Sequence, residues 1–323
     1  MKKRIFAAVF AVVLCLLSGC GGEAQKESAP VRVGSLKGPT SMGLVKLMSD
    51  AENGEAGQDY QFTMAVAADE ITAALLREEL DIALLPANLA AVLYNKTEGE
   101  LVALDINTLG VLYLLENGEA IESVQDLAGK TVYLPGKGTT PDYALQYLLA
   151  QNGVALDEVN LQYKSEGAEV IAAMLEDADG LGLLPQPATT AACMQNKKFR
   201  IALDLTEEWD KLETDSMLVT GVTVARRAFL EEQEEAVKLF LKEHGDSAVY
   251  VRENPAQAAK WIENLGIVPT AAIAEKAIPY CSITCLTGSE MERALSGYLA
   301  VLLEQNAASV GGALPEKNFY YLP

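Results

Sequence analysis

The chain has 323 residues and a formal net charge of −20, from 45 acidic and 25 basic side chains. A chain this acidic is repelled by nucleic acids and anionic lipid surfaces, and no run of basic residues offsets the charge, which excludes nucleic-acid binding. Half of the composition is apolar, so the chain is long enough to bury a large core, and its length favours two domains.

Residues 1–19 are expected to be a secretory signal peptide. Lys2-Lys3-Arg4 precede an apolar run that is too short to remain in a bilayer as a spanning helix. The sequence Leu17-Ser18-Gly19-Cys20 resembles a bacterial lipobox, in which cleavage leaves the cysteine as a lipid-carrying first residue. The alternative is an ordinary signal peptide that ends near a cysteine. Residues 20–30 are predicted to form a tether, and Cys20 is expected to anchor the chain to the extracytoplasmic face of the cell membrane.

From Val31 onward, short apolar runs typical of strands alternate with helical stretches. This alternation predicts an α/β fold with mostly parallel sheets covered by helices. The expected strands are 31–36, 60–67, 81–86, 102–107, 131–135, 159–164, 180–185 and 199–205. The expected helices are 41–50, 69–78, 88–95, 141–153 and 169–176. After Phe229 the pattern becomes almost continuous helix.

Two motifs occur twice at nearly the same spacing. "SLKGPTSMG" places Lys-Gly-x-Thr after a strand at Lys37, and "LPGKGTTPDYA" repeats it at Lys137. A strand ending in Leu-Leu-Pro closes at Pro86 and again at Pro185. The second loop is not a nucleotide-binding loop, because Gly138 occupies the position after Lys137 where that motif needs a Ser or Thr. The repeat predicts two lobes of similar topology.

The predicted lobes are residues 31–108 with 222–323, and residues 109–221. The chain crosses between them in "INTLGVLYLLENG" and "DSMLVTGVTVARR". Ligands bind outside the carboxyl ends of strands in open parallel sheets, so the four repeated loops are expected to face one cleft. This geometry predicts a hinged two-lobe clamshell with a C-terminal helical segment.

The chain resembles the substrate-binding proteins of ABC importers, in the type II periplasmic-binding family that binds nitrate, sulfonates and thiamin precursors. "ESVQDLAGKTVYLPGKGTTPDYALQYLLAQNGV", "LDIALLPANLAAVLYN" and the "NPAQAA" break after a long helix carry the resemblance. It implies a solute receptor that acts as a monomer without a cofactor and delivers its ligand to an ABC permease and ATPase.

The candidate ligand-binding residues lie in the loops at the expected cleft. Helix N-termini offer free backbone N–H groups and a positive dipole end, while Thr, Ser, Asn and Gln side chains add hydrogen bonds. Each group has an alternative role. The hydroxyls and Asn88 could instead cap helices, and the lysines could be solvated at the rim of the cleft. Asn107 and Thr108 could instead form turns at a strand end. The candidates are Lys37, Gly38, Thr40, Ser41, Asn88, Asn107, Thr108, Lys137, Gly138, Thr139, Thr140 and Gln186.

The loops favour a small, polar ligand that is anionic or zwitterionic, such as a sulfonate. A neutral heteroaromatic molecule, such as a pyrimidine or vitamin precursor, and a non-transport sensor lipoprotein are the alternatives. An enzyme of the same fold is not expected, because Asp142 is the one titratable group other than lysine at the loop tips and is assigned to helix stabilisation. His244, the single histidine, is assigned to a surface or helix-end position.

Cys281 and Cys285 are spaced one helical turn apart, and either two free thiols or a disulfide fits this spacing. As metal ligands they lack sequence partners, because the chain has one histidine and no second cysteine pair. No metal site is therefore expected.

Overall fold

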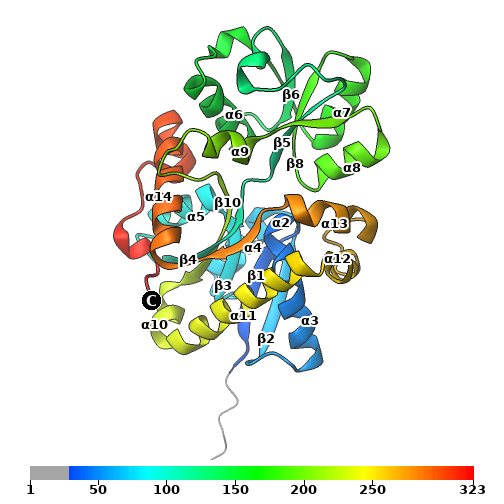
Figure 1. Cartoon of the computed structure of the whole chain (residues 1–323). Coiled ribbons are helices and arrows are strands. Elements are labelled where there is room, and N and C mark those ends of the chain that lie inside the picture. The colour runs from blue at the N-terminus through cyan, green and yellow to red at the C-terminus, as the bar shows by residue number, and fades with distance from the viewer. Residues whose placement is uncertain (1–28) are drawn as a thin grey trace, which may run out of the picture.

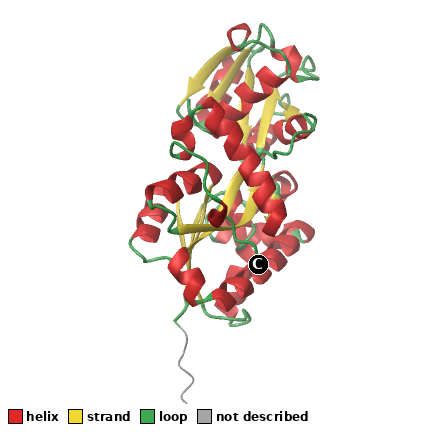
Figure 2. Ribbon diagram, turned by 90° about the vertical axis from the view of Figure 1, so that its left-hand side faces the viewer, coloured by secondary structure: helices red, strands yellow, loops and turns green. Residues whose placement is uncertain are grey.

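The computed structural model describes residues 29–323 (Figure 1). The predicted signal peptide, the lipidation site Cys20 and most of the predicted tether lie outside the described residues. Two sheets form separate layers, and we call the six-stranded sheet with its helices lobe 1 and the five-stranded sheet with its helices lobe 2. Figure 2 shows both sheets flanked by helices.

The sheet of lobe 1 has the strand order β11-β4-β10-β3-β1-β2. Strand β1 is parallel to β2 and β3, whereas β10 is antiparallel to both β3 and β4, and β11 is antiparallel to β4. Its strands are β1 (Val31–Leu36), β2 (Tyr60–Ala65), β3 (Ile82–Pro86), β4 (Leu101–Leu109), β10 (Val219–Arg226) and β11 (Ile283–Leu286).

The sheet of lobe 2 has the order β7-β6-β8-β5-β9. Strand β6 is parallel to β7 and β8, and β5 is antiparallel to β8 and β9. Its strands are β5 (Leu112–Glu116), β6 (Thr131–Pro135), β7 (Asn160–Lys164), β8 (Leu181–Pro185) and β9 (Arg200–Asp204). Both sheets are therefore mixed: most strands of each sheet run in one direction, as predicted, whereas β10 and β11 in lobe 1 and β5 in lobe 2 run in the opposite direction. The cause is that β10 and β5 each follow a crossing between the lobes and enter the new sheet in the opposite direction.

The internal repeat seen in the sequence is a repeat of topology. The order β2-β1-β3-β10-β4 in lobe 1 corresponds to β7-β6-β8-β5-β9 in lobe 2, with the antiparallel strand in the same place. The Lys-Gly-x-Thr loops follow β1 and β6, and the Leu-Leu-Pro motifs end β3 and β8. The prediction of two similar α/β lobes is confirmed.

The five expected helices before Phe229 all overlap helices of the structure, although the first is divided at residues 43–44, and the helices at 188–195 and 205–210 were not among those predicted. The short β11 interrupts the predicted run of helices, and it pairs with β4 at the edge of the lobe 1 sheet. The helices are α2 (Pro39–Met42), α3 (Val45–Asn53), α4 (Ala68–Leu76), α5 (Ala87–Lys96), α6 (Thr140–Gln151), α7 (Gly167–Glu176), α8 (Ala188–Gln195), α9 (Leu205–Asp210), α10 (Arg227–Glu232), α11 (Glu234–Glu253), α12 (Pro255–Asn264), α13 (Ala271–Ala277) and α14 (Gly288–Gln305). None of the helices in residues 29–323 combines the length and apolar character needed to cross a bilayer.

The C-terminal segment closes lobe 1. Tyr321 donates its backbone N–H to the Ala103 carbonyl at 2.9 Å, and Phe319 is fully buried against the ring of Tyr94. Burying a phenylalanine side chain stabilises a fold by about 1.5–3 kcal/mol. Helix α14 contacts α5, β4 and β10 in lobe 1 and α6 in lobe 2 (Figure 1), so it links the two lobes along one side.

Candidate functional site

The carboxyl ends of the parallel strands in both lobes face the junction between them. Pro86 pairs with Gly221, close to where β4 leaves lobe 1, and Pro185 pairs with Leu112, the first residue of β5 in lobe 2. The connection between the two sheets on this side is Gly110-Val111. The four repeated loops are therefore brought to one junction, as the repeat predicted.

In lobe 1, the loop after β1 turns tightly into α2. Gly38 has a φ of 147°, which glycine adopts without steric cost. The Thr40 hydroxyl donates to the Leu36 carbonyl at 3.2 Å, and the Ser41 hydroxyl lies 3.0 Å from that of Ser35 and also donates to Leu36. These two hydroxyls are committed to the end of β1, and neither caps the helix.

Asn107 and Thr108 lie at the end of β4, beside Thr40. An ideal Cβ placed on Gly221 would lie 2.5 Å from Asn107 Oδ1 and 2.5 Å from Thr40 Cγ2, so the three residues are in close contact. Asn107 also accepts a bond from the Thr108 hydroxyl at 2.9 Å and donates to Thr223 at 3.2 Å. The structure thus gathers Thr40, Asn107 and Thr108 into one buried polar group.

In lobe 2, a carboxylate already occupies the Lys-Gly-Thr-Thr loop. The backbone N–H of Gly138 donates to Asp142 at 2.8 Å, and Asp142 also accepts from Tyr163 and Gln146. The Thr139 hydroxyl closes the turn by donating to the Gly136 carbonyl at 2.5 Å. Asp142 acts as the helix-stabilising residue that the sequence suggested, and it places a negative charge where an anionic ligand was expected.

The remaining predicted residues point in different directions. Lys137 is exposed and lies over the Tyr163 ring, with Nζ 5.4 Å from the centroid, whereas exposed Lys37 lies beside Gly266. The Asn88 amide donates to the Ser309 carbonyl at 3.4 Å, and Thr140 lies beside Tyr298 of α14. Among residues 29–323, no hydrogen bond joins a predicted ligand residue of lobe 1 to one of lobe 2.

Gln186 is buried at the lobe junction, 2% exposed. Its carbonyl oxygen accepts from the Thr190 hydroxyl at 2.8 Å, and its backbone N–H donates to the Val111 carbonyl at 2.9 Å. Its Nε2 amide group is buried and has no hydrogen-bond partner in the described protein. An unpaired buried donor costs about 1–3 kcal/mol, so Gln186 is suited to bind an acceptor supplied by a ligand.

Two further hydroxyls at the junction share this property. Thr206 Oγ1 and Thr220 Oγ1 are buried without hydrogen-bond partners among the described residues. A Cβ built in the ideal position on Gly110 would lie only 2.1 Å from Thr206 Oγ1, so the Thr206 hydroxyl packs directly against this glycine. Thr220 lies in β10 between Val219 and Gly221, where the register of β10 against β4 shifts. Three of the six buried, unpaired side-chain polar atoms in residues 29–323 thus lie where the chain crosses between the lobes, and the other three belong to His244 and Gln305.

An aromatic pair spans the junction next to these groups. Tyr113 of β5 and Tyr280 from lobe 1 have ring centroids 6.1 Å apart in an edge-to-face arrangement. Burial raises the pKa of Tyr113, and the charge of Asp204, its partner across the sheet, raises it further. The sequence analysis did not identify Tyr113, Tyr280 or Asp204, because strand register and the interlobe contact decide their proximity.

The structure corrects the assignment of His244. It lies inside α11 and is fully buried, and its Nδ1 is 3.1 Å from Asp105 Oδ2. Cys285 of β11 joins this pair, and the three ligand-type atoms lie within 4.8 Å of one another. Cys285 therefore has two candidate metal-ligand neighbours in the fold, although its neighbours in the sequence offer none. Cys281 and Cys285 are free thiols in the structure, which leaves the disulfide alternative unsupported.

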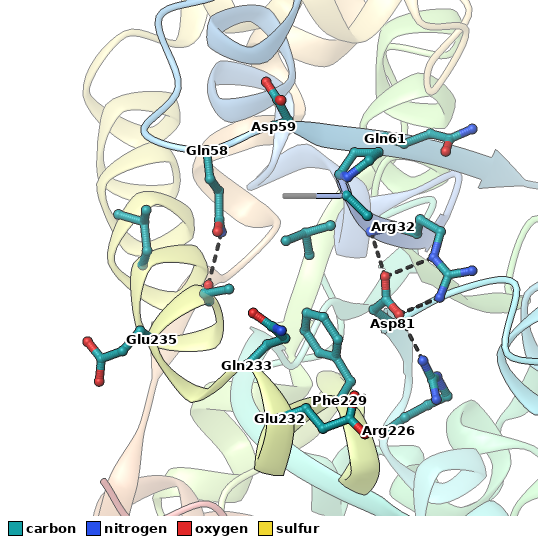
Figure 3. Close-up of a pocket in the computed structure, with 15 residues that line it drawn as sticks. Arg32, Gln58, Asp59, Gln61, Asp81, Arg226, Phe229, Glu232, Gln233 and Glu235 are labelled. Atoms are coloured by element: carbon teal, nitrogen blue, oxygen red, sulfur yellow. Dashed lines mark hydrogen bonds and ion pairs between the residues drawn. The ribbon is translucent and has the colours of Figure 1, made fainter. Parts of the chain in front are cut away.

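A large pocket of about 800 Å³ lies elsewhere, at the opposite end of lobe 1. Figure 3 shows the residues that line it. It is lined by the start of β1, by residues 58–61 and by α10 and α11, on the side of the amino end of β1. Its two arginines are already engaged, since Arg32 and Arg226 both donate to Asp81 at distances of 2.5–3.0 Å. Solutes bind at carboxyl ends of strands in such sheets, so this pocket is a weaker candidate than the junction.

Comparison with known structures shows the same fold over nearly the whole chain. An ABC transporter protein from Parabacteroides distasonis is 25% identical, with a TM-score of 0.76 over 91% of this chain and 98% of the other. The aliphatic sulphonate-binding protein of Escherichia coli is 18% identical, with a TM-score of 0.69 over 90% and 96%. A zinc-bound ligand-binding component of an ABC-type import system from Staphylococcus aureus is 14% identical, with a TM-score of 0.66 over 91% and 97%.

The two lobes and the junction between them therefore define a protein of the periplasmic-binding-protein class. Residues 100–258 match the model of the NMT1/THI5-like family. This match and the ABC transporter protein at 25% identity agree with the resemblance drawn from the motifs of the sequence. No curated protein sequence matches the chain.

Proposed function

We propose that this chain is the extracytoplasmic solute-binding receptor of an ABC importer, and that its solute binds between the two lobes. The observation that carries the proposal is the set of buried, unpaired polar atoms at the junction: Gln186 Nε2, Thr206 Oγ1 and Thr220 Oγ1. Buried polar groups in proteins are almost always hydrogen-bonded, so three unpaired groups at one junction indicate a polar ligand. The family and fold support a receptor rather than an enzyme.

In this account the lobes close over the solute by bending at the two crossings. The first crossing is short, at Gly110-Val111, and the second lies between α9 and β10. The closed receptor would dock on a permease and release the solute when it opens, as the hinge-type binding fold allows. The rigid bodies of this motion follow the predicted lobe limits, residues 31–108 with 222–323 and 109–221, except that Leu109 and residues 219–221 belong to strands of the lobe 1 sheet.

The ligand is small and polar, and an anionic or zwitterionic solute is our first candidate. The facing ends of the sheets carry the amino ends of α6 and α8, where backbone N–H groups and helix dipoles favour negative charge. Asp142 offsets this at Gly138, so a zwitterion fits better than a bare anion. A neutral heteroaromatic is the second candidate, and the Tyr113–Tyr280 pair is the observation that favours it.

We also propose that Cys20 carries a lipid anchor that holds the receptor at the outer face of the membrane. The basic start, the short apolar run and the sequence before Cys20 support this. In cells expressing the full chain, Cys20→Ser should move the protein from the detergent phase to the aqueous phase on phase separation. Retention of the variant in the detergent phase would argue against an anchor at Cys20.

A thermal-shift screen of the purified protein tests the receptor proposal. Sulfonates, nitrate, bicarbonate, amino acids, pyrimidines and flavins cover the ligand classes under comparison. A solute at one hundred times its Kd should add about 2.7 kcal/mol to the free energy of unfolding and raise Tm by several degrees. If no compound shifts Tm and the unfolded protein releases no bound molecule, a sensor or protein-partner role replaces the transport receptor.

Two variants then locate the site. Gln186→Met keeps the side-chain volume but removes the unpaired amide, and should abolish most of the shift. Gln58→Met is the matched control, because Gln58 bonds to Tyr60 and Ala236 in the pocket at the opposite end of lobe 1. A shift that survives in Gln186→Met and is lost in Gln58→Met would place the solute in that pocket instead.

A further inference from the structure

Three side chains that sequence reasoning kept apart meet inside lobe 1. Asp105 comes from β4, His244 from α11 and Cys285 from β11, and their ligand atoms lie within 4.8 Å of one another. Asp105 and His244 are fully buried, and Cys285 is partly buried. Their chemistry is that of a metal site, because carboxylate oxygen, imidazole nitrogen and thiolate sulfur are the three ligand types that Zn²⁺ accepts.

We propose that Asp105, His244 and Cys285 form a three-ligand site for Zn²⁺. The first support is charge balance: one carboxylate and one thiolate carry two negative charges, which a divalent cation neutralises. Unpaired charges in a protein interior are costly, whereas a neutral complex can be buried. Without an ion, Asp105 has His244 as its one ion-pair partner among the described residues.

The second support is how the two fully buried ligands are oriented. The Thr223 hydroxyl donates to Asp105 Oδ1 at 2.8 Å, while Oδ2 faces His244 Nδ1 at 3.1 Å. Metal-binding carboxylates are commonly held in place by such a second hydrogen bond. His244 Nε2 is buried and has no partner among the described residues, and an ion between His244 Nδ1 and Asp105 Oδ2 would replace their hydrogen bond by two bonds to the metal.

The third support is that the cluster can reach ligand spacing with small movements. Ligand atoms 2.0–2.3 Å from a tetrahedral ion lie roughly 3.3–3.8 Å apart, so the carboxylate and imidazole need to separate by only a few tenths of an ångström. Cys285 lies on the short edge strand β11, and its thiol donates a long hydrogen bond of 3.9 Å to the Leu241 carbonyl, which a metal-bound thiolate would give up. The three protein ligands leave a fourth position for water or another donor.

Cobalt is the probe, because Co²⁺ replaces Zn²⁺ in such sites and its absorption reports its ligands. The purified protein is freed of metal with a chelator and titrated with Co²⁺. We expect binding of one equivalent, tetrahedral d–d bands and a thiolate-to-cobalt charge-transfer band, all removed by one equivalent of Zn²⁺. A spectrum without the thiolate-to-cobalt band would overturn the proposal. So would a protein that binds Co²⁺ no more tightly than the metal-ion buffer binds it.

Cysteine variants supply the matched comparison. Cys285→Ser should lose the charge-transfer band and weaken Zn²⁺ binding at least about tenfold. Cys193→Ser is the control, since Cys193 is also a partly buried free thiol but lies on α8 in lobe 2. Equal Zn²⁺ affinity in both variants would contradict the site.

A measurement on the unaltered protein guards against a variant that folds poorly. Zn²⁺ should slow alkylation of Cys285 by iodoacetamide, read by peptide mass spectrometry, and leave the rate at Cys193 unchanged. Alkylation of Cys285 at the same rate with and without Zn²⁺ would overturn the proposal, whatever the variants show. The proposal does not depend on the identity of the solute or on the transport role.

Discussion

The Tyr113 hydroxyl of lobe 2 donates a hydrogen bond of 2.9 Å to the Tyr280 carbonyl of lobe 1. Any opening of the lobes at the crossing must break this bond and separate the two rings. The bond therefore stabilises the arrangement in which the junction residues are buried. It is one of the contacts that decide how often the unliganded protein opens.

Tyr113→Phe should loosen the junction without removing the ring. Loss of a buried hydrogen bond costs about 0.5–1.5 kcal/mol, so amide exchange at residues 108–113 and 278–283 should be roughly two- to tenfold faster. Hydrogen exchange followed by mass spectrometry measures this. Tyr133→Phe is the control, because its hydroxyl bonds to Asp177 within lobe 2. Equal rates in the wild type and Tyr113→Phe would show that the bond does not restrain opening.

Gly221→Ala should disrupt the buried polar group of lobe 1. The new methyl would meet Asn107 Oδ1 and Thr40 Cγ2 at 2.5 Å, so both side chains must move. Overpacking of this kind costs about 1–3 kcal/mol in the free energy of unfolding, and solute affinity should fall as well. Urea denaturation and solute titration test the two effects. Gly118→Ala serves as the control, because the nearest atom to its new methyl would be 4.0 Å away. Equal stability and equal solute affinity in the two variants would refute the close contact at Gly221.

Asp81→Asn should destabilise lobe 1 at neutral pH. Burial opposes ionisation of Asp81, but bonds from Arg32 and Arg226 outweigh it and lower the pKa of this carboxyl. Removing one partner of a largely buried ion pair costs about 3 kcal/mol, at the low end here because Arg32 reaches solvent. Denaturant titration at pH 7 measures the loss. An unchanged unfolding midpoint would show that the Asp81 charge, paired with the two arginines, does not stabilise the folded protein.

The same pair predicts a pH dependence. Because the folded pKa of Asp81 lies below its unfolded value of about 3.9, its contribution is complete above that pH and is lost as the pH falls through the folded pKa. The stability difference between the wild type and Asp81→Asn should therefore shrink below about pH 4. A difference that stays constant to pH 2 would contradict the assignment.

Sequence patterns predicted the strands well where a strand was long enough to show its boundaries. Strands β1 and β6 have the predicted limits, because turn residues follow each apolar run. Strand β11 was missed because Ile283–Leu286 is too short to show a period. The reversed direction of β5 and β10 was not predicted, because it depends on the path between the lobes, which no local pattern records.

The site was only partly predictable for a related reason. Alternation along β4 places Asp105 and Asn107 on one face of the strand. This pattern indicates a buried polar pair, although the pair was not predicted. His244 was assigned to the surface from its charged neighbours, although Val237, Phe240, His244 and Val251 form one buried helical stripe. Contacts across the junction, such as Tyr113 with Tyr280, depend on tertiary structure and have no local sequence signal.

Hydrogen exchange with a solute from the thermal-shift screen tests the central claim most directly. If the solute binds between the lobes, protection should appear in both lobes at once, at residues 37–42 and 107–111 and at residues 185–190 and 204–206. Protection confined to residues 29–32, 58–61 and 226–239 would place the solute in the pocket at the opposite end of lobe 1. Protection of one lobe alone would contradict binding between the lobes.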